Sequence, residues 1–464
     1  VAMLDEPSYK ELFLNPRSVV FVGVPRKSGP GSLNPVDNLR AWGYTGAIHI
    51  VHPHVSQIAG LDTVPAISSL NAPVDLAIIA TPRETIPGIV SQCASKGIKA
   101  VIVTNQGFAE ADSRGKELQR RMLEAALSTG TRILGPNTLG VSNSFDRFTS
   151  SFMPLNREEI AIGVACQSGV FFVGSPQLTG GLGIGIDVGN ESDIGLTDAI
   201  EWLGRDRRLK ALAVHAEGIQ RGKRFLDVTS EVSLRIPIVA MKTGRSPLGA
   251  LAATSHSGSM AGQDRIVEAV MRKAGIVRVE ESQDMLDLLG GFLRLPPMKG
   301  RRVAVITLTG AGGIILLDTM HLWGLSAAKL DENSLMSVQS LFPPWMHAGN
   351  PMDIWAALMK NGMKKVYGVA LRDVLNDSNV DGVICLALGL DSKNQKYFNA
   401  VEEIQNLSLE FSKPLLVWVY GPQVEDVRAQ INQYGRAMTI PSLERGVKVL
   451  ARMAQYEMWR QTSE

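Results

Sequence analysis

Cysteine is scarce in this sequence, and its scarcity excludes two classes of protein. The chain has 3 cysteines among 464 residues, and no two of them have the CxxC spacing of a zinc knuckle. Cysteines so few and so far apart provide no disulfide framework, and they fit the reducing environment of the cytoplasm. We therefore expect a cytoplasmic protein without a disulfide framework.

An excess of charge of one sign is missing as well. The 47 Lys and Arg residues nearly balance the 45 Asp and Glu residues, for a formal net charge of +2. This balance favours neither nucleic acid nor an anionic membrane as a partner, although it leaves small anionic ligands open. No apolar run approaches the ~20 residues that a membrane-spanning helix requires, and the start, VAMLDEPSYKEL, lacks the pattern of an export signal. We expect no membrane partner and no nucleic-acid partner.

Short apolar runs rich in valine and isoleucine are present along the whole chain, and they alternate with longer amphipathic stretches. Buried parallel strands joined by helical crossovers have this pattern, so the predicted fold class is α/β. With 45% apolar and 20% charged residues, the chain is long enough and apolar enough to form several hydrophobic cores. We expect three domains.

Three series of candidate strands predict three parallel sheets. The five strands of the first series would make one doubly wound sheet. The segment LRLPPMKG at 293–300 has two prolines and a glycine, and it is typical of a linker between domains. The earlier boundary is less sharply marked, near residues 145–156. The predicted strands are 18–23, 47–51, 76–80, 100–104 and 132–134; 160–166, 183–188, 211–215 and 236–241; and 302–307, 381–387 and 414–419, with a helix over 443–459.

Each series opens with a strand, a loop of small residues and a helix, in the runs VVFVGVPRKSGPGS, IGVACQSGV and AVITLTGAGGI. Such loops direct backbone N–H groups and the positive end of a helix dipole toward the space above the sheet, where anions bind readily. A glycine after a buried strand can equally serve tight packing between strand and helix. Three such loops in one chain indicate a protein that handles phosphate groups.

Seven short motifs along the chain are more specific together than any one alone. They are SVVFVGV at 18–24, GFAE at 107–110, GPNTLGVSN at 135–143, QSG at 167–169, HAEGI at 215–219, SHSGSMAG at 255–262 and NPMD at 350–353. In these motifs the chain resembles, over nearly its whole length, the alpha subunit of ADP-forming acetyl-CoA synthetase and related NDP-forming acyl-CoA synthetases. Its first two thirds also resemble the alpha subunit of succinyl-CoA synthetase.

The resemblance implies a Rossmann-like CoA-binding domain followed by two flavodoxin-like parallel-sheet domains of the succinyl-CoA synthetase type. The expected domains are residues 1–146, which would bind CoA, 147–298, which would carry a phosphorylated histidine, and 299–464. The resemblance also implies a hetero-oligomer with a beta subunit that has an ATP-grasp domain, because no stretch of this chain is left over for one. ATP or ADP with Mg²⁺ would bind that partner, whereas this chain would bind CoA, a carboxylic acid and phosphate.

The candidate catalytic residues are His256 and Glu217. His256 lies among small residues in LAATSHSGSMAGQDRI, and an imidazole near pH 7 can accept a phosphoryl group and pass it on. Glu217 follows a predicted buried strand, where its carboxylate could hold one imidazole nitrogen and leave the other free to attack. The alternatives are a loop histidine bonded to backbone and a capping or salt-bridged glutamate. The resemblance favours the catalytic reading of both residues.

Phosphate would be bound at two helix N-termini, according to the same resemblance. Each helix end contributes on the order of 1 kcal/mol, so a converging pair is a sensible way to hold a phosphoryl dianion. The glycines could instead only pack a helix on its sheet, and Asn137, next to Gly and Pro, could only form a turn. The expected phosphate-binding residues are Asn137, Gln167, Ser168 and Gly169, together with Gly310, Ala311, Gly312 and Gly313 from the third domain.

CoA would be bound by the loops of the first domain. The loop after the first strand has Arg26 and Lys27 among small residues, which suits nucleotide phosphates. Here the sequence departs from the family, because Val24 and Pro25 replace small residues and His54 replaces a lysine. Each of the later loop residues could equally be an ordinary surface residue. The expected CoA-binding residues are Gly23, Val24, Arg26, Lys27, Ser28, His54, Thr81, Pro82, Gln106 and Gly107.

Three other functional hypotheses are weaker. His52 and His54 have no third ligand nearby in sequence, so no metal site is expected. A nicotinamide dehydrogenase would need a GxGxxG motif and an acidic residue after the second strand, and both are missing. A catalytically idle CoA-sensing or acyl-CoA-sensing regulatory module is favoured by the altered first loop, but the presence of His256 and Glu217 argues against it. The acyl group and the choice between ADP and GDP are not encoded in any motif.

Overall fold

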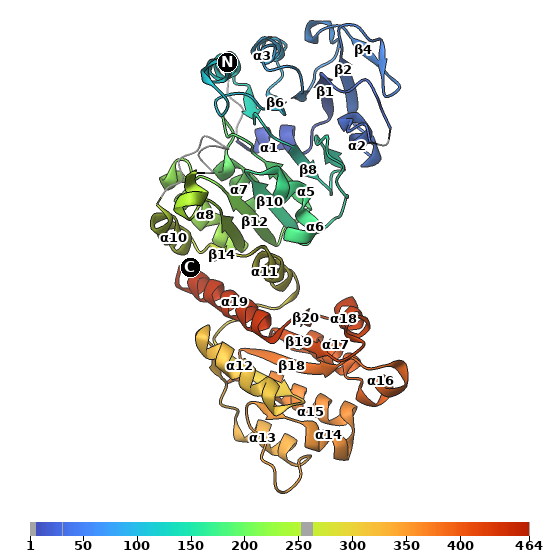
Figure 1. Cartoon of the computed structure of the whole chain (residues 1–464), viewed down its shortest axis with the longest axis vertical. Coiled ribbons are helices and arrows are strands. Elements are labelled where there is room, and N and C mark those ends of the chain that lie inside the picture. Colours follow the sequence, from blue (N-terminus) through green and yellow to red (C-terminus); the bar gives the residue numbers. More distant parts are fainter. Residues whose placement is uncertain (1–5, 30, 252–262, 464) are drawn as a thin grey trace. The chain divides into compact units, whose positions relative to one another are not determined.

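The computed structural model describes residues 6–29, 31–251 and 263–463. The chain divides into two compact units, Val1–Met285 and Leu286–Glu464 (Figure 1). The first unit has two seven-stranded sheets and the second unit has one six-stranded sheet, all dominated by parallel strands, so the α/β class is confirmed. In the described ranges, no helix is long and apolar enough to cross a membrane.

The first sheet has the strand order β3-β4-β2-β1-β5-β6-β7, in which only β3 and β4 pair antiparallel. Strands β2 to β4 lie on one side of the central strand β1, and β5 to β7 lie on the other, so the sheet is doubly wound as predicted. The prediction of five strands was incomplete. Strand β3 has only 2 residues, and β4, with the sequence LDTV, is not an apolar buried run. The strands are β1 (Ser18–Val22), β2 (Ala47–Val51), β3 (Gln57–Ile58), β4 (Leu61–Val64), β5 (Leu76–Ile79), β6 (Ala100–Val103) and β7 (Arg132–Leu134).

The second sheet has the order β14-β13-β12-β10-β11-β8-β9, with β10, β12, β13 and β14 parallel and β8 antiparallel to β11. The four predicted strands are present, but three short ones were missed. One of these, β8, lies within the segment expected to belong to the CoA-binding domain, so the chain joins the second sheet before residue 147. The strands are β8 (Gly140–Asn143), β9 (Phe148–Thr149), β10 (Ile162–Cys166), β11 (Ile184–Asp187), β12 (Ala211–Ala216), β13 (Ile238–Lys242) and β14 (Val277–Val279).

The two sheets of the first unit share a hydrophobic core. Val19 and Phe21 on β1 belong to the same buried cluster as Ile184 on β11 and Trp202, and the rings of Phe13 and Trp202 stack with centroids 5.7 Å apart. A separate cluster covers the other face of the first sheet. The helices are α1 (Glu6–Leu14), α2 (Pro35–Ala41), α3 (Ile86–Ser95), α4 (Ser113–Leu127), α5 (Gly169–Val173), α6 (Ser175–Leu178), α7 (Leu196–Gly204), α8 (Gly222–Arg235) and α10 (Asp264–Lys273). Helix α11 (Ser282–Arg294) begins in this unit, and its residues from 286 on belong to the second unit.

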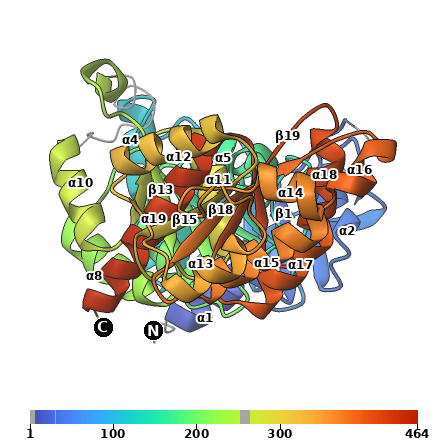
Figure 2. The same ribbon diagram turned by 90° about the horizontal axis from the view of Figure 1, so that it is seen from below.

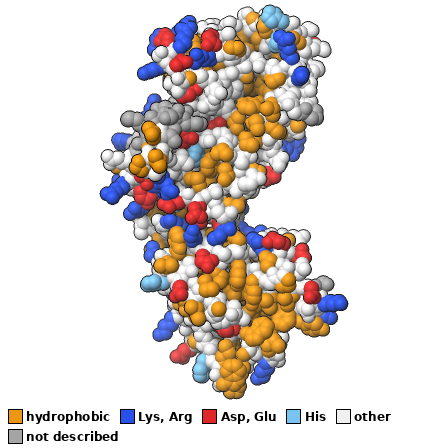
Figure 3. Space-filling model, viewed as in Figure 1, with side chains coloured by type: hydrophobic (Ala, Val, Ile, Leu, Met, Phe, Trp, Pro, Cys, Tyr) orange, Lys and Arg blue, Asp and Glu red, His pale blue; other side chains and the backbone are white. Residues whose placement is uncertain are grey.

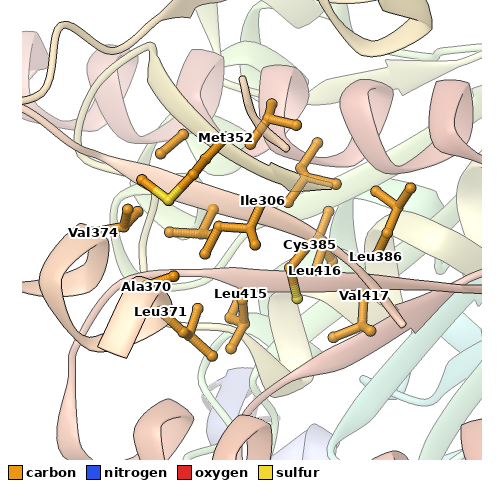
Figure 4. Close-up of a cluster of buried hydrophobic side chains, with 14 of the residues drawn as sticks. Ile306, Met352, Ala370, Leu371, Val374, Cys385, Leu386, Leu415, Leu416 and Val417 are labelled. Atoms are coloured by element: carbon orange, nitrogen blue, oxygen red, sulfur yellow. The ribbon is translucent and has the colours of Figure 1, made fainter. Parts of the chain in front are cut away.

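The sheet of the second unit has the order β16-β15-β18-β19-β20, and β17 also pairs with β15. Helices α12 and α19 lie on one side of this sheet, and α13 and α15 lie on the other (Figure 2). Figure 4 shows Ala370, Leu371 and Val374 of α15 packed toward buried strand residues, and all of them belong to one core cluster. The strands are β15 (Arg302–Thr307), β16 (Ser326–Ala327), β17 (Met352–Asp353), β18 (Gly382–Leu388), β19 (Leu415–Tyr420) and β20 (Met438–Ile440).

The segment 293–300, which was expected to be a linker between domains, is instead part of the second unit. Helix α11 continues to Arg294, and the side chains of Leu295 and Met298 are buried in the core of that unit. Two adjacent prolines follow this helix end, but the segment is still held in the unit, because the apolar residues on either side of the pair are packed. The further helices are α12 (Gly310–Leu322), α13 (Glu332–Gln339), α14 (Trp355–Asn361), α15 (Met363–Asn376), α16 (Ser392–Phe398), α17 (Val401–Glu410), α18 (Val424–Gln433) and α19 (Leu443–Ser463).

Candidate active site

The carboxyl ends of β10 and β12 bring together several of the predicted site residues. Residues 167–169 follow β10 directly, and Glu217 follows β12. The two strands are neighbours, with Cys166 opposite His215, and the chain continues from β10 to one side of the sheet and from β12 to the other. Ligands of α/β proteins bind at such a switch point.

The side chain of Gln167 connects the two strand ends. Its Nε2 donates to Glu191 Oε1 at 2.8 Å and to the carbonyl oxygen of Gly218 at 2.9 Å. Its Oε1 accepts the N–H of Gly218 at 3.1 Å and the N–H of Glu217. The amide is thus engaged at both ends, so the structure assigns it to holding the loop after β12. The predicted role of Gln167 in phosphate binding stays a prediction, and binding through its side chain would compete with these bonds.

Several titratable groups lie close to Glu217. Burial raises the pKa of the Asp187 carboxyl to about 6, against the hydrogen bonds that it accepts, and the charge of Glu217 adds to the rise. One of those bonds is from the N–H of Leu139 at 2.7 Å. At the end of β13, burial lowers the pKa of Lys242, and Glu217 opposes that shift. Glu217 is therefore surrounded by groups whose charges depend on its own, as is common at functional sites.

His215 is enclosed and is not a second phosphate carrier. Its side chain is 3% exposed, and its ring stacks on Phe171 with centroids 4.2 Å apart. Burial lowers its pKa to about 4, with a further contribution from the charge of Lys242, so the ring is neutral at physiological pH. A ring that is covered in this way cannot be reached by an acyl phosphate.

His256 lies outside the described residues, and its role stays a prediction. The ends of the chain on either side can be described. Lys242, the last residue of β13, is paired with Ala216 of β12, directly before Glu217. On the far side of the segment, Asp264 raises the pKa of Lys242 by its charge, so it lies in the same region. Lys242 and Asp264, which flank the segment that contains His256, therefore both lie near the end of the strand that precedes Glu217.

The predicted helix N-termini are present, but some of their glycines have packing roles. Ser168 is the N-cap of α5, and a Cβ at Gly169 would come within 2.9 Å of the Leu139 side chain. In the second unit α12 begins at Gly310, with Thr309 as its N-cap. A Cβ at Gly312 would lie 2.8 Å from Leu386 and one at Gly313 would lie 3.0 Å from Pro351. Only Gly310 has open space beside it, so packing explains Gly312 and Gly313. The expected convergence of the two helix ends is a relation between the units and stays a prediction, as does the role of Ala311.

Asn137 links the loops of both sheets in the first unit. Its φ of 60° lies in the left-handed region that asparagine tolerates. Its N–H donates to the carbonyl oxygen of Asn105 at 2.8 Å, and its Nδ2 donates to Asn190 Oδ1 at 3.2 Å. The residue thus has the structural turn role that was held open, and it also lines the cavity described next.

A cavity of about 620 Å³ opens at the carboxyl ends of β1, β5 and β6 in the first sheet. Of the residues expected to bind CoA, Gly23, Val24 and Gln106 line it, and Thr81 touches its wall at Gly23. Gly23 has a φ of 87°, and a Cβ there would lie 2.7 Å from the carbonyl oxygen of Ala80, so only glycine fits. The other lining residues are Phe21, Pro25, Ser32, Leu33, Pro35, Ile78, Ala80, Thr104, Asn105, Asn137, Ser150 and Phe152.

The remaining predicted CoA residues do not line this cavity. Arg26, Lys27 and Ser28 are exposed on the loop after β1, and the charge of Arg26 contributes to a lowered pKa of His52. His52 Nδ1 accepts the N–H groups of His54 and Val55 at 3.1 and 3.0 Å, so it shapes its own loop. Pro82 is exposed, and Gly107 is bound through its carbonyl oxygen to Arg83 and through its N–H to Glu110. In the described part of the chain, no group of three or more His, Cys, Asp and Glu side chains could hold a metal ion.

Four residues near the two sites were missed from the sequence. Asp187 is the last residue of β11, and Glu191 lies in the loop that follows. The rule that α/β sites gather at the carboxyl ends of strands would have found both. Asn105 follows another predicted strand in the same way. Phe152, which lines the cavity, carries no such signal, because it comes from the segment after β9.

Comparison with known proteins agrees with this geometry. Residues 17–144 match the family described as CoA binding domain, and residues 160–292 match the family described as succinyl-CoA ligase like flavodoxin domain. The first unit therefore combines a CoA binding domain with a succinyl-CoA ligase like flavodoxin domain, and the chain is similar over most of its length to ADP-forming acetate–CoA ligases.

Relatives cover nearly the whole chain. It is 34% identical to acetate–CoA ligase [ADP-forming] II of Archaeoglobus fulgidus over 89% of this chain, and it spans 62% of the length of that protein. It is 29% identical to the alpha subunit of acetate–CoA ligase [ADP-forming] II of Pyrococcus furiosus, covering 95% of this chain and 96% of that subunit. Acetyl-coenzyme A synthetase 1 of Ca. Korarchaeum cryptofilum, solved with phosphate and ADP, has a TM-score of 0.85 at 28% identity, with 97% of both chains covered.

Proposed function

We propose that this chain is the alpha subunit of an NDP-forming acyl-CoA synthetase. The enzyme interconverts acyl-CoA, NDP and phosphate with a carboxylic acid, CoA and NTP. Phosphate attacks the thioester carbonyl carbon, so the carbon–sulfur bond breaks and an acyl phosphate and CoA form. His256 then accepts the phosphoryl group and releases the carboxylate. The phosphorylated ring passes that group to NDP and returns to its first state.

The observation that carries this proposal is the position of Glu217. It follows β12, whose neighbour β13 precedes the segment that contains His256. Its backbone N–H donates a hydrogen bond to Gln167 Oε1. A carboxylate held in this way orients an imidazole by one hydrogen bond and stabilises the positive charge of the phosphorylated ring. Ser168, Gly169 and the start of α12 would supply N–H groups to the phosphoryl oxygens.

The cavity of the first sheet fits the arm of CoA. Apolar side chains such as Phe21 and Ile78 line it together with the polar groups of Asn105 and Gln106. The Oδ1 atom of Asn105 is buried and has no hydrogen-bond partner among the described residues, so an amide N–H of the arm would satisfy it. Val24 and Pro25, which replace smaller residues of the family, also line the cavity, which keeps a volume of about 620 Å³.

A beta subunit with an ATP-grasp domain would bind the nucleotide and Mg²⁺. The match to a separate alpha subunit of nearly the same length supports this division of the enzyme. Figure 3 displays hydrophobic side chains gathered on the second unit, where Met359 and Tyr397 are exposed and the rings of Trp355 and Phe398 stack. Exposed apolar surface of this kind is typical of protein contacts, which is consistent with a partner subunit.

The test is phosphorylation of this chain by its partner subunit with labelled ATP. We expect acid-labile, base-stable label, because a phosphoramidate has that stability and a phosphoserine does not. His256→Ala should abolish the label without changing the thermal unfolding temperature. Label that persists in this variant would place the nucleophile elsewhere.

The second candidate is a catalytically idle module that binds CoA or acyl-CoA. The bulk of Val24 and Pro25 in the cavity favours it, because these residues alter the CoA loop. The same experiment distinguishes the two functions. A chain that binds CoA but takes no label from any NTP in the presence of the beta subunit would be the idle module.

A further inference from the structure

Glu191 contacts the network around Gln167 from a separate loop, between β11 and α7. Its Oε1 accepts a hydrogen bond from Gln167 Nε2 at 2.8 Å and another from the N–H of Leu196 at 2.7 Å. Its backbone has a φ of 52°, in the left-handed region that glutamate rarely adopts. A backbone conformation of this kind persists only where the surroundings hold it, and it is concentrated at functional sites.

The carboxylate of Glu191 decides which way the amide of Gln167 faces. Burial raises the pKa of the Glu191 carboxyl to about 7, against the hydrogen bonds that it accepts from Gln167 and Leu196. Oε1 can accept these bonds in either protonation state, and the ionised form can only accept, so it requires the NH₂ end of the amide. The oxygen end then faces the loop after β12, where the N–H groups of Glu217 and Gly218 donate to it. If the amide turned over, its NH₂ group would face these two donors, and its oxygen would face Glu191 and the Gly218 carbonyl. All four bonds would be lost together.

We infer that Glu191 is a positioning residue for phosphoryl transfer. It fixes the amide of Gln167, and that amide fixes the strand end that carries Glu217. The inference rests on the proposed function, in which Glu217 orients His256. Glu191 touches neither substrate nor reacting atoms in this account, and its effect on Glu217 passes through Gln167.

Two substitutions of Glu191 distinguish the effect of its hydrogen bond to Gln167 from the effect of its left-handed backbone conformation. Glu191→Gln keeps an oxygen at the same reach, which can still accept from Gln167 and Leu196. Glu191→Asn suits the left-handed backbone equally well or better, but it is one CH₂ shorter and loses the contact with Gln167. Glu231→Asn, at an exposed glutamate on α8 that lies 3.7 Å from Arg235, is the control for loss of a surface carboxylate.

The first measurement is hydrogen exchange of the peptide that contains Glu217 and Gly218, which needs no activity. We expect Glu191→Asn to speed exchange of these amides by about tenfold, whereas Glu191→Gln and Glu231→Asn leave it unchanged. Unchanged exchange in Glu191→Asn would overturn the inference, whatever the protein catalyses.

The second measurement is the single-turnover rate of phosphorylation by the partner subunit, with CoA affinity alongside. We expect Glu191→Asn to lower the rate by about tenfold or more at unchanged CoA affinity, and Glu191→Gln to stay within about threefold of the wild type. In a Gln167→Leu background, Glu191→Asn should cause no further loss, because the two residues act as one unit. Rate losses that multiply in the double variant would overturn the inference. A rate that resists His256→Ala and Glu217→Gln would instead refute the proposed function, while the exchange result would still decide the role of Glu191.

Discussion

The two sheets of the first unit carry their candidate sites at the same edge but build them differently. At the first sheet, shape dominates, since apolar side chains and one glycine in a left-handed conformation enclose a cavity of about 620 Å³. At the second sheet, directed hydrogen bonds dominate, since Gln167 joins two loops through both ends of its amide. A site formed mainly by packed apolar side chains should tolerate the loss of one charge, whereas a site formed by a network of hydrogen bonds should not.

The largest effect that this comparison predicts is at the second sheet. Glu217→Gln keeps the shape of the side chain and removes its charge, so phosphorylation of the chain by its partner should slow by about 10²- to 10⁴-fold. CoA affinity, measured by calorimetry, should not change, because Glu217 does not line the cavity. Glu231→Gln on α8 is the matched control, and unchanged phosphorylation in Glu217→Gln would mean that Glu217 is structural. Lost CoA affinity would mean that the two sites are not separate.

At the first sheet, the sensitive residue is one without a side chain. Gly23→Ala would set a Cβ 2.6 Å from Thr81 Cγ2 and 2.7 Å from the carbonyl oxygen of Ala80, at a φ of 87°. We expect it to lower the free energy of unfolding by about 2–4 kcal/mol and to abolish the rise in unfolding temperature that CoA causes. Gly88→Ala on α3 is the control, since no atom lies within 4 Å of its added Cβ. A full CoA-induced shift in Gly23→Ala would show that CoA binds elsewhere.

A smaller effect concerns the pH dependence of stability. The folded-state pKa of Asp187 is raised to about 6. Its contribution to stability is therefore complete below the unfolded pKa of about 4, and it is lost as the pH rises through about 6. Asp187→Asn removes this titration, so the fall in the free energy of unfolding between about pH 4.5 and about pH 8 should shrink by about 2 kcal/mol. Denaturant unfolding at both pH values measures it. An equal fall in both proteins would contradict the raised pKa.

Much of the fold was predictable from the sequence, because most buried parallel strands leave continuous apolar runs. Strands β2, β7 and β15 lie at their predicted residues. The missed strands, such as β3 and β16 with 2 residues each, have no period to detect, and they form only because a neighbouring strand pairs with them. The domain boundaries were harder to predict from the sequence. Strand β8 joins the second sheet because it pairs with β11, and nothing in its composition indicates that pairing.

The sequence predicted where the candidate site lies, but it did not predict the hydrogen bonds within the site. Motifs and the carboxyl-end rule located Gln167, Glu217 and the loop after β1. They could not tell that the amide of Gln167 is occupied, because hydrogen bonds across 24 and 51 residues depend on the packing of loops. Arg26 and Lys27 have the charge that a nucleotide phosphate needs, but they are exposed and do not line the cavity, although Pro25 of the same loop does. His256 stays a prediction from its motif.

Helix α1 precedes the first sheet in sequence but is attached to both halves of the first unit. Phe13 stacks on Trp202 of α7, Asn143 of β8 donates to the carbonyl oxygen of Leu14 at 3.1 Å, and the guanidinium of Arg132 on β7 lies over the Tyr9 ring. The segment 17–144, which matches the CoA binding domain, is therefore not an independent unit that can be exchanged between relatives. In a chimera that takes residues 17–144 from a relative, α1 would pack against residues of the donor. Such a chimera needs the matching α1 and α7 from the same donor to fold as one unit.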